Sequence, residues 1–203
     1  MIGPGEPSSR AARLGFGLTG GLLGLMCLAI VLTVTTFPVG AAMEPTVVKL
    51  PEFSVIGIQA RTSNADEMTG DGAIPKQWAR FFKEGIADKI PNKVDSTIYA
   101  VYTDYVSDRN GEYDFIIGMK VSSVSDVPPG MVAKKVPRGK YAVVTSEKGP
   151  AAHIVPRAWQ RVWSLEDNKQ LGGPRAYKAD FEVYDQRSQN PQDSQVDLYL
   201  GLK

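Results

Sequence analysis

The sequence predicts an α+β fold. A tandem strand–helix–strand–strand repeat forms an antiparallel sheet with two main helices and a central groove, preceded by one N-terminal hydrophobic helix. Strand-like and helix-like segments alternate from residue 51 to the end of the chain. Two helix openings match: IPKQWARFF at 74–82 and VPRAWQRVW at 155–163 share Pro, Trp and Arg in register. The strands that follow them match as well, which indicates an internal duplication.

The first half begins with a predicted strand at 53–60, FSVIGIQA, and a polar loop follows it. Pro75 suits the first turn of a helix, where its missing N–H is not needed. Apolar residues then recur at helical spacing until Pro91. Strands at 97–106 and 112–121 follow, joined by the turn SDRNG.

The second half repeats this order after a short connector. A strand is predicted around 141–147, and Pro156 is expected to open the second helix after a short loop. Strands follow at 175–185 and 196–203. The last strand, VDLYLGLK, shares Asp, Gly and Lys in register with YDFIIGMK at 113–120.

The duplication predicts a pseudo-twofold domain at 43–203, with halves at about 51–121 and 131–203. Each half contributes one amphipathic helix with an indole at the same position. Clefts between related halves are common places for small-molecule sites. The sequence therefore predicts a groove between the two helices.

The N-terminal residues differ in composition from the rest of the chain. Residues 1–13 form a short polar start that contains Arg10 and Arg13, and residues 14–42 contain no charged residue. A hydrophobic stretch of this length can cross a bilayer as a helix, and the preceding arginines favour a cytoplasmic N-terminus. We expect residues 14–42 to be a membrane anchor, with the C-terminal domain outside the cytoplasm.

Two alternatives stay open. Small residues at 39–42 suit signal peptidase, so the segment can be a cleaved signal that leaves a secreted domain. Translation can also start at Met43, which would leave the domain in the cytoplasm.

Glu182 breaks the symmetry of the halves, because Thr103 holds the matching position. Glutamate is not favoured in the middle of a strand. Alternation places Glu182 on one face with Asp180 and Tyr184, opposite Phe181. If that face meets water, Glu182 is an ordinary surface residue. If it faces the groove, the carboxylate is desolvated and a cationic ligand would stabilise it.

The helix aromatics also have two interpretations. Trp78, Phe82, Trp159 and Trp163 recur at helical spacing and can pack as core or line the groove. Tyr199, on the neighbouring strand, could stand over the same face as Glu182. Aromatic walls around a carboxylate would attract a cation through their π faces.

Other chemistry has little support in the sequence. A net charge of +1 provides no field that would recruit nucleic acid, and we expect no nucleic-acid partner. The single His153 and the single Cys27 lie far apart, so we expect no catalytic dyad and no metal site. No cofactor-binding fingerprint is present.

These motifs resemble the GyrI-like small-molecule-binding domain. That family includes effector-binding domains of drug-sensing bacterial transcription activators, the DNA gyrase inhibitory protein and integron-cassette proteins that bind cationic drugs. The resemblance covers nearly all of 43–203 and depends on FSVIG, the I-P-x-x-W helix opening, GKYAVV, the W-x-x-x-W helix, DFEVYD and the terminal DLYLGL.

The resemblance implies a ligand groove with Glu182 at its floor, lined by Trp78, Trp163, Tyr105 and Tyr199. It implies binding of amphipathic, cationic aromatic molecules without catalysis. Two alternatives remain: hydrolysis of a strained ring using Glu182, as some relatives do, and a gyrase-directed protein interaction if the domain is cytosolic.

Overall fold

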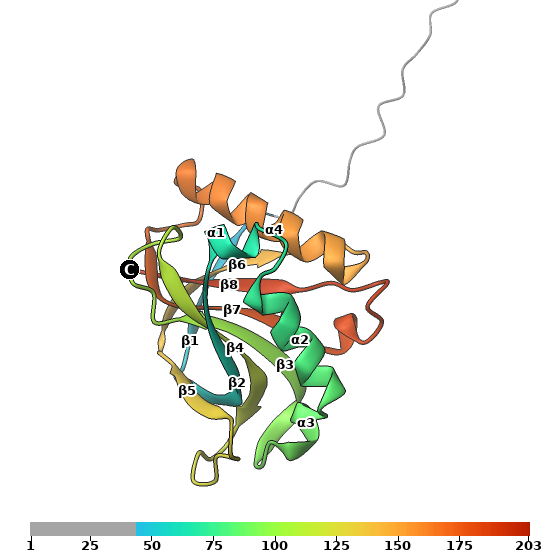
Figure 1. The fold of residues 1–203 in the computed structure, drawn as a ribbon. Coiled ribbons are helices and arrows are strands. Elements are labelled where there is room, and N and C mark those ends of the chain that lie inside the picture. The colour runs from blue at the N-terminus through green and yellow to red at the C-terminus, as the bar shows by residue number, and fades with distance from the viewer. Residues whose placement is uncertain (1–43) are drawn as a thin grey trace, which may run out of the picture. The chain divides into compact units, whose positions relative to one another are not determined.

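The computed structural model describes residues 44–203, which form one eight-stranded antiparallel sheet with four α-helices (Figure 1). The strands are β1 Thr46–Leu50, β2 Phe53–Ser63, β3 Lys93–Thr103, β4 Glu112–Val121, β5 Val132–Val136, β6 Gly139–Thr145, β7 Arg175–Tyr184 and β8 Asp197–Leu202. The helices are α1 Asn64–Glu67, α2 Ala73–Lys83, α3 Ile86–Lys89 and α4 Ala151–Asp167, and a 3-10 turn, η1, covers Gln186–Ser188.

The predicted α+β fold with a tandem repeat is confirmed. Its predicted N-terminal hydrophobic helix, at residues 14–42, lies outside the described residues. Within 44–203, no helix is both long and apolar enough to cross a membrane.

The strand order shows the duplication directly. The sheet reads β1-β6-β8-β7-β3-β4-β2-β5, so β7 and β3 meet at its centre and every strand has a counterpart on the other side. The leading strands are exchanged between the halves, because β1 pairs with β6 and β5 pairs with β2. This exchange joins the halves through backbone hydrogen bonds at both outer edges as well as at the centre.

Both long helices cover the same face of the sheet. Apolar side chains of α2 pack on β2, β3 and β4, with Phe81 fully buried among them. Those of α4 pack on β6 and β8 through Ile154 and Val162. Trp159 and Tyr184 contact both clusters, so the two helix-covered cores meet beside β7.

The opposite face of the sheet is concave and packs against itself. Phe53 of β2 and Phe181 of β7 have ring centroids 5.4 Å apart, although their strands lie three positions apart in the sheet. Strands three positions apart in a flat sheet would be separated by about 14 Å. The facing glycines Gly57 and Gly118 permit this curvature, because a Cβ on either would lie within 2.3 Å of a backbone oxygen of the partner strand (2.2 and 2.1 Å).

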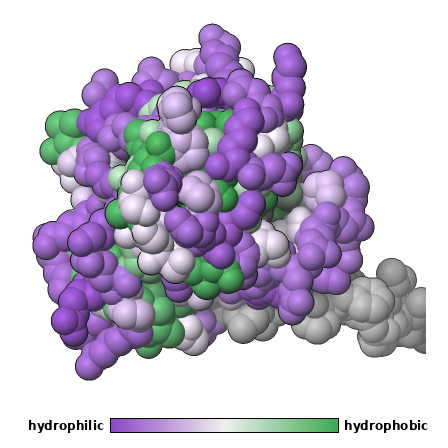
Figure 2. Space-filling view, turned by 90° about the horizontal axis from the view of Figure 1, so that it is seen from below, coloured by the Kyte–Doolittle hydropathy of each residue, from purple (hydrophilic) through white to green (hydrophobic). Residues whose placement is uncertain are grey.

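The face shown in Figure 2 is largely hydrophilic, with hydrophobic residues between the polar ones in small patches. Phe82 is the largest exposed apolar side chain in the described region, with 64% of its surface accessible.

Two expectations about element boundaries were wrong. The second helix begins at Ala151, not at Pro156, so Pro156 lies inside α4. The early start is stabilised by backbone bonds from Ala151 N to Pro191 O and between Gly149 and Ser194, which fix the entry of the helix. The first helix ends at Lys83, because Gly85 adopts a left-handed conformation and begins the separate α3.

The concave aromatic core predicts a large effect for Phe181→Ala. Phe181 is 2% exposed and stacks on Tyr199 at 4.6 Å. Its loss should lower the free energy of unfolding by about 3–5 kcal/mol, because the cavity left behind cannot collapse fully. Phe82→Ala is the matched control and should cost about 0.5 kcal/mol or less, because that ring is exposed. Urea denaturation measures both, and similar losses in the two variants would contradict the packing described here.

Candidate functional site

A cavity of about 320 Å³ lies between the two halves, on the helix-covered face of the sheet. One half contributes α1, the start of α2, and β3 and β4 with their connecting turn, and the other contributes α4 and the start of β7. Its aromatic lining residues are Tyr102, Tyr105, Tyr113, Trp159 and Trp163, and its polar ones are Asn64, Glu67, Arg109, Gln160 and Arg175. This volume is in the range of small-molecule sites.

Glu182 lies directly behind the aromatic wall of this cavity. It is 1% exposed, and three aromatic side chains donate hydrogen bonds to its carboxylate. Tyr102 Oη and Trp159 Nε1 donate to Oε1 at 2.7 and 2.6 Å, and Tyr184 Oη donates to Oε2 at 2.7 Å. Tyr102 and Trp159 also line the cavity. Their rings border the cavity, while the Tyr102 hydroxyl and the Trp159 ring nitrogen donate to Glu182.

The strand explains why a carboxylate is held at this depth. β7 is a central strand, and alternation directs Asp180, Glu182 and Tyr184 to the helix-covered face while Phe181 packs on the concave one. Across from Glu182 on β3 is Ala100, a small residue. The predicted alternation is therefore confirmed. Glu182 does not face water, and it is buried behind the cavity wall and does not line the cavity itself.

Burial raises the pKa of the Glu182 carboxyl above its usual value, while the hydrogen bonds from Tyr184, Trp159 and Tyr102 act in the opposite direction. Desolvation is the larger effect, because both oxygens are removed from water. No ion pair reaches Glu182 from the described residues, so the charge of its ionised form is stabilised by neutral donors alone.

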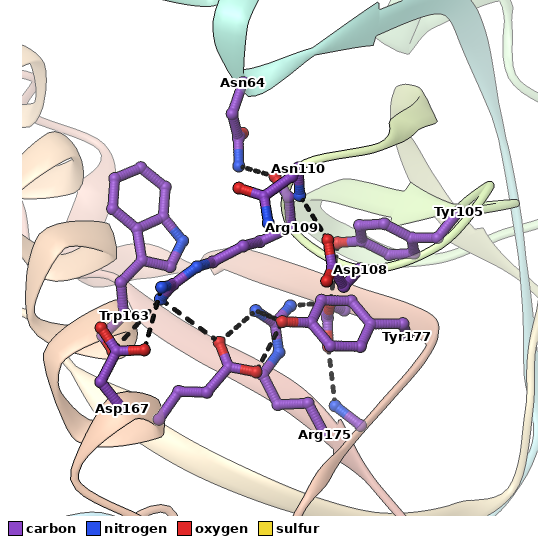
Figure 3. A network of polar contacts seen from close by, with 12 residues as sticks. Asn64, Tyr105, Asp108, Arg109, Asn110, Trp163, Asp167, Arg175 and Tyr177 are labelled. Atoms are coloured by element: carbon purple, nitrogen blue, oxygen red, sulfur yellow. Dashed lines mark hydrogen bonds and ion pairs between the residues drawn. The ribbon is translucent and has the colours of Figure 1, made fainter.

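Asp180, two residues before Glu182 on the same face, has the opposite arrangement. The buried Arg175 forms an ion pair with it, Tyr105 Oη donates to it at 2.7 Å, and the backbone N–H of Gly201 donates at 2.8 Å. Arg175 also donates to Glu166 at 3.3 Å and packs 4.2 Å from the ring centroid of Tyr177 (Figure 3). Asp180 thus has a cationic partner, and Glu182 has none among the described residues.

Some of the predicted site residues line the cavity and others do not. Trp163 and Tyr105 line the cavity, and Glu182 lies just behind it. Trp78 does not line the cavity, but its ring lies 4.8 Å from the ring of Tyr184, the donor to Glu182. The expectation that Tyr199 shares the face of Glu182 is wrong, because Tyr199 is paired with Phe181 and stacks on it in the concave core.

Sequence reasoning did not identify the hydrogen-bond donors to Glu182, although it named Trp159 as a groove aromatic and placed Tyr184 on the same face. Trp159 and Trp78 occupy the matching helix positions, and the duplication signalled that both indoles approach one centre. The structure shows that Trp159 does so directly and Trp78 through Tyr184. Tyr184 could have been found from alternation, which places it on the face of Glu182. Tyr102 could have been found only from the pairing of β3 with β7.

Residues 46–202 match the family model described as integron-associated effector binding protein. The chain belongs to this family. It is also similar to two curated proteins, each 36% identical. One is YobU of Bacillus subtilis, which is named for a role in transcriptional regulation, and the match covers 72% of this chain and 90% of YobU.

The second relative is the transcriptional regulator BrlR of Pseudomonas aeruginosa, where the match covers 79% of this chain. The matched region spans 56% of the length of BrlR. The similarity therefore concerns the effector-binding region and leaves much of that regulator unmatched.

Solved structures show the same fold. An integron cassette protein of Vibrio cholerae has a TM-score of 0.64 and 27% identity, covering 80% of this chain and 97% of that one. The protein SAV2435, solved with tetraphenylphosphonium, has a TM-score of 0.61 and 16% identity, covering 79% and 94%. The resemblance to the GyrI-like effector-binding domain is thereby confirmed.

The raised pKa of Glu182 predicts a pH-dependent difference between wild type and Glu182→Gln. A carboxyl whose pKa rises on folding binds its proton more tightly in the folded state, so its contribution to stability falls as pH rises above the usual value of 4.5. The free energy of unfolding of wild type should therefore fall relative to that of Glu182→Gln between pH 4 and 8. Urea denaturation across this range measures the difference.

The exposed Glu84 supplies the control, since Glu84→Gln makes the same chemical change on the surface of the domain. Its stability should follow that of wild type across the range. If Glu182→Gln followed wild type in the same way, the desolvation of Glu182 described above would be contradicted.

Proposed function

We propose that the cavity binds amphipathic aromatic molecules that carry a positive charge, and that it does so without catalysis. The observation that carries this proposal is a buried carboxylate whose three donors are all aromatic and neutral. Membership of the effector-binding family supports a small-molecule ligand. The charge of that ligand is inferred from the site itself.

The contrast between Glu182 and Asp180 indicates the sign of the ligand's charge. Both are buried carboxylates on one face of β7, and Asp180 has Arg175 as a cationic partner. Within 44–203, Glu182 has no such partner, although only the aromatic wall formed by Tyr102 and Trp159 separates it from the cavity. Burying an unpaired charge costs several kcal/mol, and a cation in the cavity would offset part of that cost.

The aromatic wall favours the same ligands. A cation over the face of Tyr102 or Trp159 gains about 0.5–2 kcal/mol per ring from the π system. Hydrogen bonding to the carboxylate adds electron density to these rings, because linked hydrogen bonds polarise one another. Glu182 can therefore attract a cation through the rings that cover it, without the ligand touching its oxygens.

The aromatic cover of Glu182 also supports the proposal of binding without turnover. Both oxygens of Glu182 already accept hydrogen bonds from side chains, and an acid or base must reach the proton of a substrate or of one water. Glu182 is also buried behind the aromatic wall, so a hydrolytic role would first require Tyr102 or Trp159 to move and admit the substrate or a water. The proposal therefore assigns the carboxylate an electrostatic role.

Tetraphenylphosphonium is the appropriate first probe, since the structural neighbour SAV2435 was solved with it. The full chain should bind it. Glu182→Gln should weaken binding about tenfold, because losing one partly screened charge–charge interaction costs about 1.4 kcal/mol. Isothermal titration calorimetry measures both constants. Glu84→Gln should bind as wild type does.

Equal affinity in wild type and Glu182→Gln would remove the carboxylate from recognition. Absence of binding to any lipophilic cation would refute the proposed function as a whole.

We also propose that residues 14–42 anchor the chain, with the domain outside the cytoplasm. Support comes from the length of the uncharged segment and the two preceding arginines. In spheroplasts of an expressing bacterium, added protease should then degrade the domain while a cytoplasmic marker survives. Protection of the domain in intact spheroplasts would contradict this orientation.

A further inference from the structure

The cavity wall contains two arginines, Arg109 and Arg175, which an attractive site for cations does not require. Arg175 pairs with Asp180, and both arginines contact the carboxylate of Glu166. Along β7, Glu182 contacts Tyr102 and Trp159, while Asp180 contacts Tyr105 and Arg175. Glu182 therefore lies behind the part of the wall formed by Tyr102 and Trp159, and Asp180 lies about 7 Å along the strand, the rise of two residues. We call the part of the wall that contains Arg109 and Arg175 the arginine end.

Arg109 is held in place but keeps donor capacity. It lies on the turn between β3 and β4, and its backbone oxygen accepts from Asn64 Nδ2 at 2.7 Å. Its Nη2 pairs with Asp167 at 2.9 Å (Figure 3). Its Nη1 has only long contacts, 3.4 Å to the Trp163 oxygen and 3.8 Å to Glu166. Hydrogen bonds of this type are strongest near 2.9 Å, so a ligand oxygen can compete for Nη1.

Arg175 fixes the other side of the arginine end. Its guanidinium pairs with Asp180 and Glu166, and these carboxylates raise its pKa against the lowering effect of burial. Its Nε has no hydrogen-bond partner in the described part of the chain. The arginine end thus contains more donors than its acceptors satisfy.

The charge balance decides which acceptor fits. Arg109 and Arg175 contact three carboxylates, those of Glu166, Asp167 and Asp180, so their positive charge is already compensated. An anionic ligand group would meet this acidic surrounding, and a second cation would meet the guanidinium groups. A neutral oxygen acceptor avoids both repulsions.

We infer that the arginine end is a second subsite, in which Arg109 donates to a neutral oxygen acceptor on the ligand, such as a carbonyl. This inference rests on the proposed function and narrows its ligand class to aromatic monocations that also carry a carbonyl-type oxygen.

Three aryl phosphonium probes of similar shape test this. (4-Acetylphenyl)triphenylphosphonium presents a carbonyl, the 4-isopropylphenyl analogue has none, and the 4-carboxyphenyl analogue presents a carboxylate. The full wild-type chain should bind the acetyl probe about fivefold more tightly than the isopropyl probe, as one hydrogen bond to a charged donor allows. The carboxylate probe should bind less tightly than the acetyl probe.

Arg109→Met should abolish the preference for the acetyl probe, because methionine keeps the length of the side chain and removes the donor. Arg61→Met is the matched control. Arg61 is also a partly exposed arginine paired with two carboxylates, Glu112 and Asp114, but it does not line the cavity. This variant should retain the full preference.

A second measurement does not depend on any variant folding. The carbonyl stretching band of the isotopically labelled acetyl probe should move to lower frequency when wild type binds it, as hydrogen bonding weakens the C=O bond. An unshifted band overturns the subsite. So does equal binding of the acetyl and isopropyl probes, a preference that survives in Arg109→Met, or tighter binding of the carboxylate probe.

These failures can be told apart from failure of the proposed function. If both neutral-tailed probes bind equally and both lose affinity in Glu182→Gln, the cation site stands and the subsite falls. If neither probe binds, the proposed function and the subsite fall together.

Discussion

Much of the site depends on the burial of one carboxylate without a countercharge. Glu182 is removed from water on a central strand and is stabilised by Tyr102, Trp159 and Tyr184. Because a buried carboxylate requires hydrogen-bond donors, the donors must come from each element that packs on that face of β7. One comes from β3, one from α4 and one from β7 itself. The acid therefore fixes how the sheet and the second helix meet.

The duplication makes this arrangement possible. β7 and β3 are counterparts in the two halves and pair at the centre of the sheet, so a residue that differs between them lies near the pseudo-twofold axis. Trp78 and Trp159 are counterparts as well, but Trp159 donates to Glu182 whereas Trp78 contacts the ring of Tyr184. A symmetric scaffold thus surrounds a single asymmetric charge, and the cavity opens on one side of it.

The sequence predicted what depends on local pattern and repetition. Alternation placed Glu182 opposite Phe181, and matching helix openings placed an indole in each half. It could not place Tyr199, because the concave core forms only when strands three positions apart approach each other. The predicted helix start at Pro156 was wrong for a similar reason. Backbone hydrogen bonds with residues distant in sequence allow α4 to start five residues earlier. No sequence pattern around Arg109 marked it as a cavity residue. Arg109 lies on the β3–β4 turn and meets Asp167, at the end of α4, only in the folded structure.

The two carboxylates of β7 also explain why one cavity can have two chemically different ends. Asp180 is neutralised by Arg175, which is held by Glu166 in turn, and this chain of charges fixes the position of α4 relative to β7. Glu182 takes no part in that chain and has no cationic partner among the described residues. If both acids had cationic partners, the cavity would have no preference for charge, and if neither had one, the cost of burial would be doubled. We propose this division, with Asp180 assigned to structure and Glu182 to recognition, because it allows both acids to be buried at an affordable cost in stability.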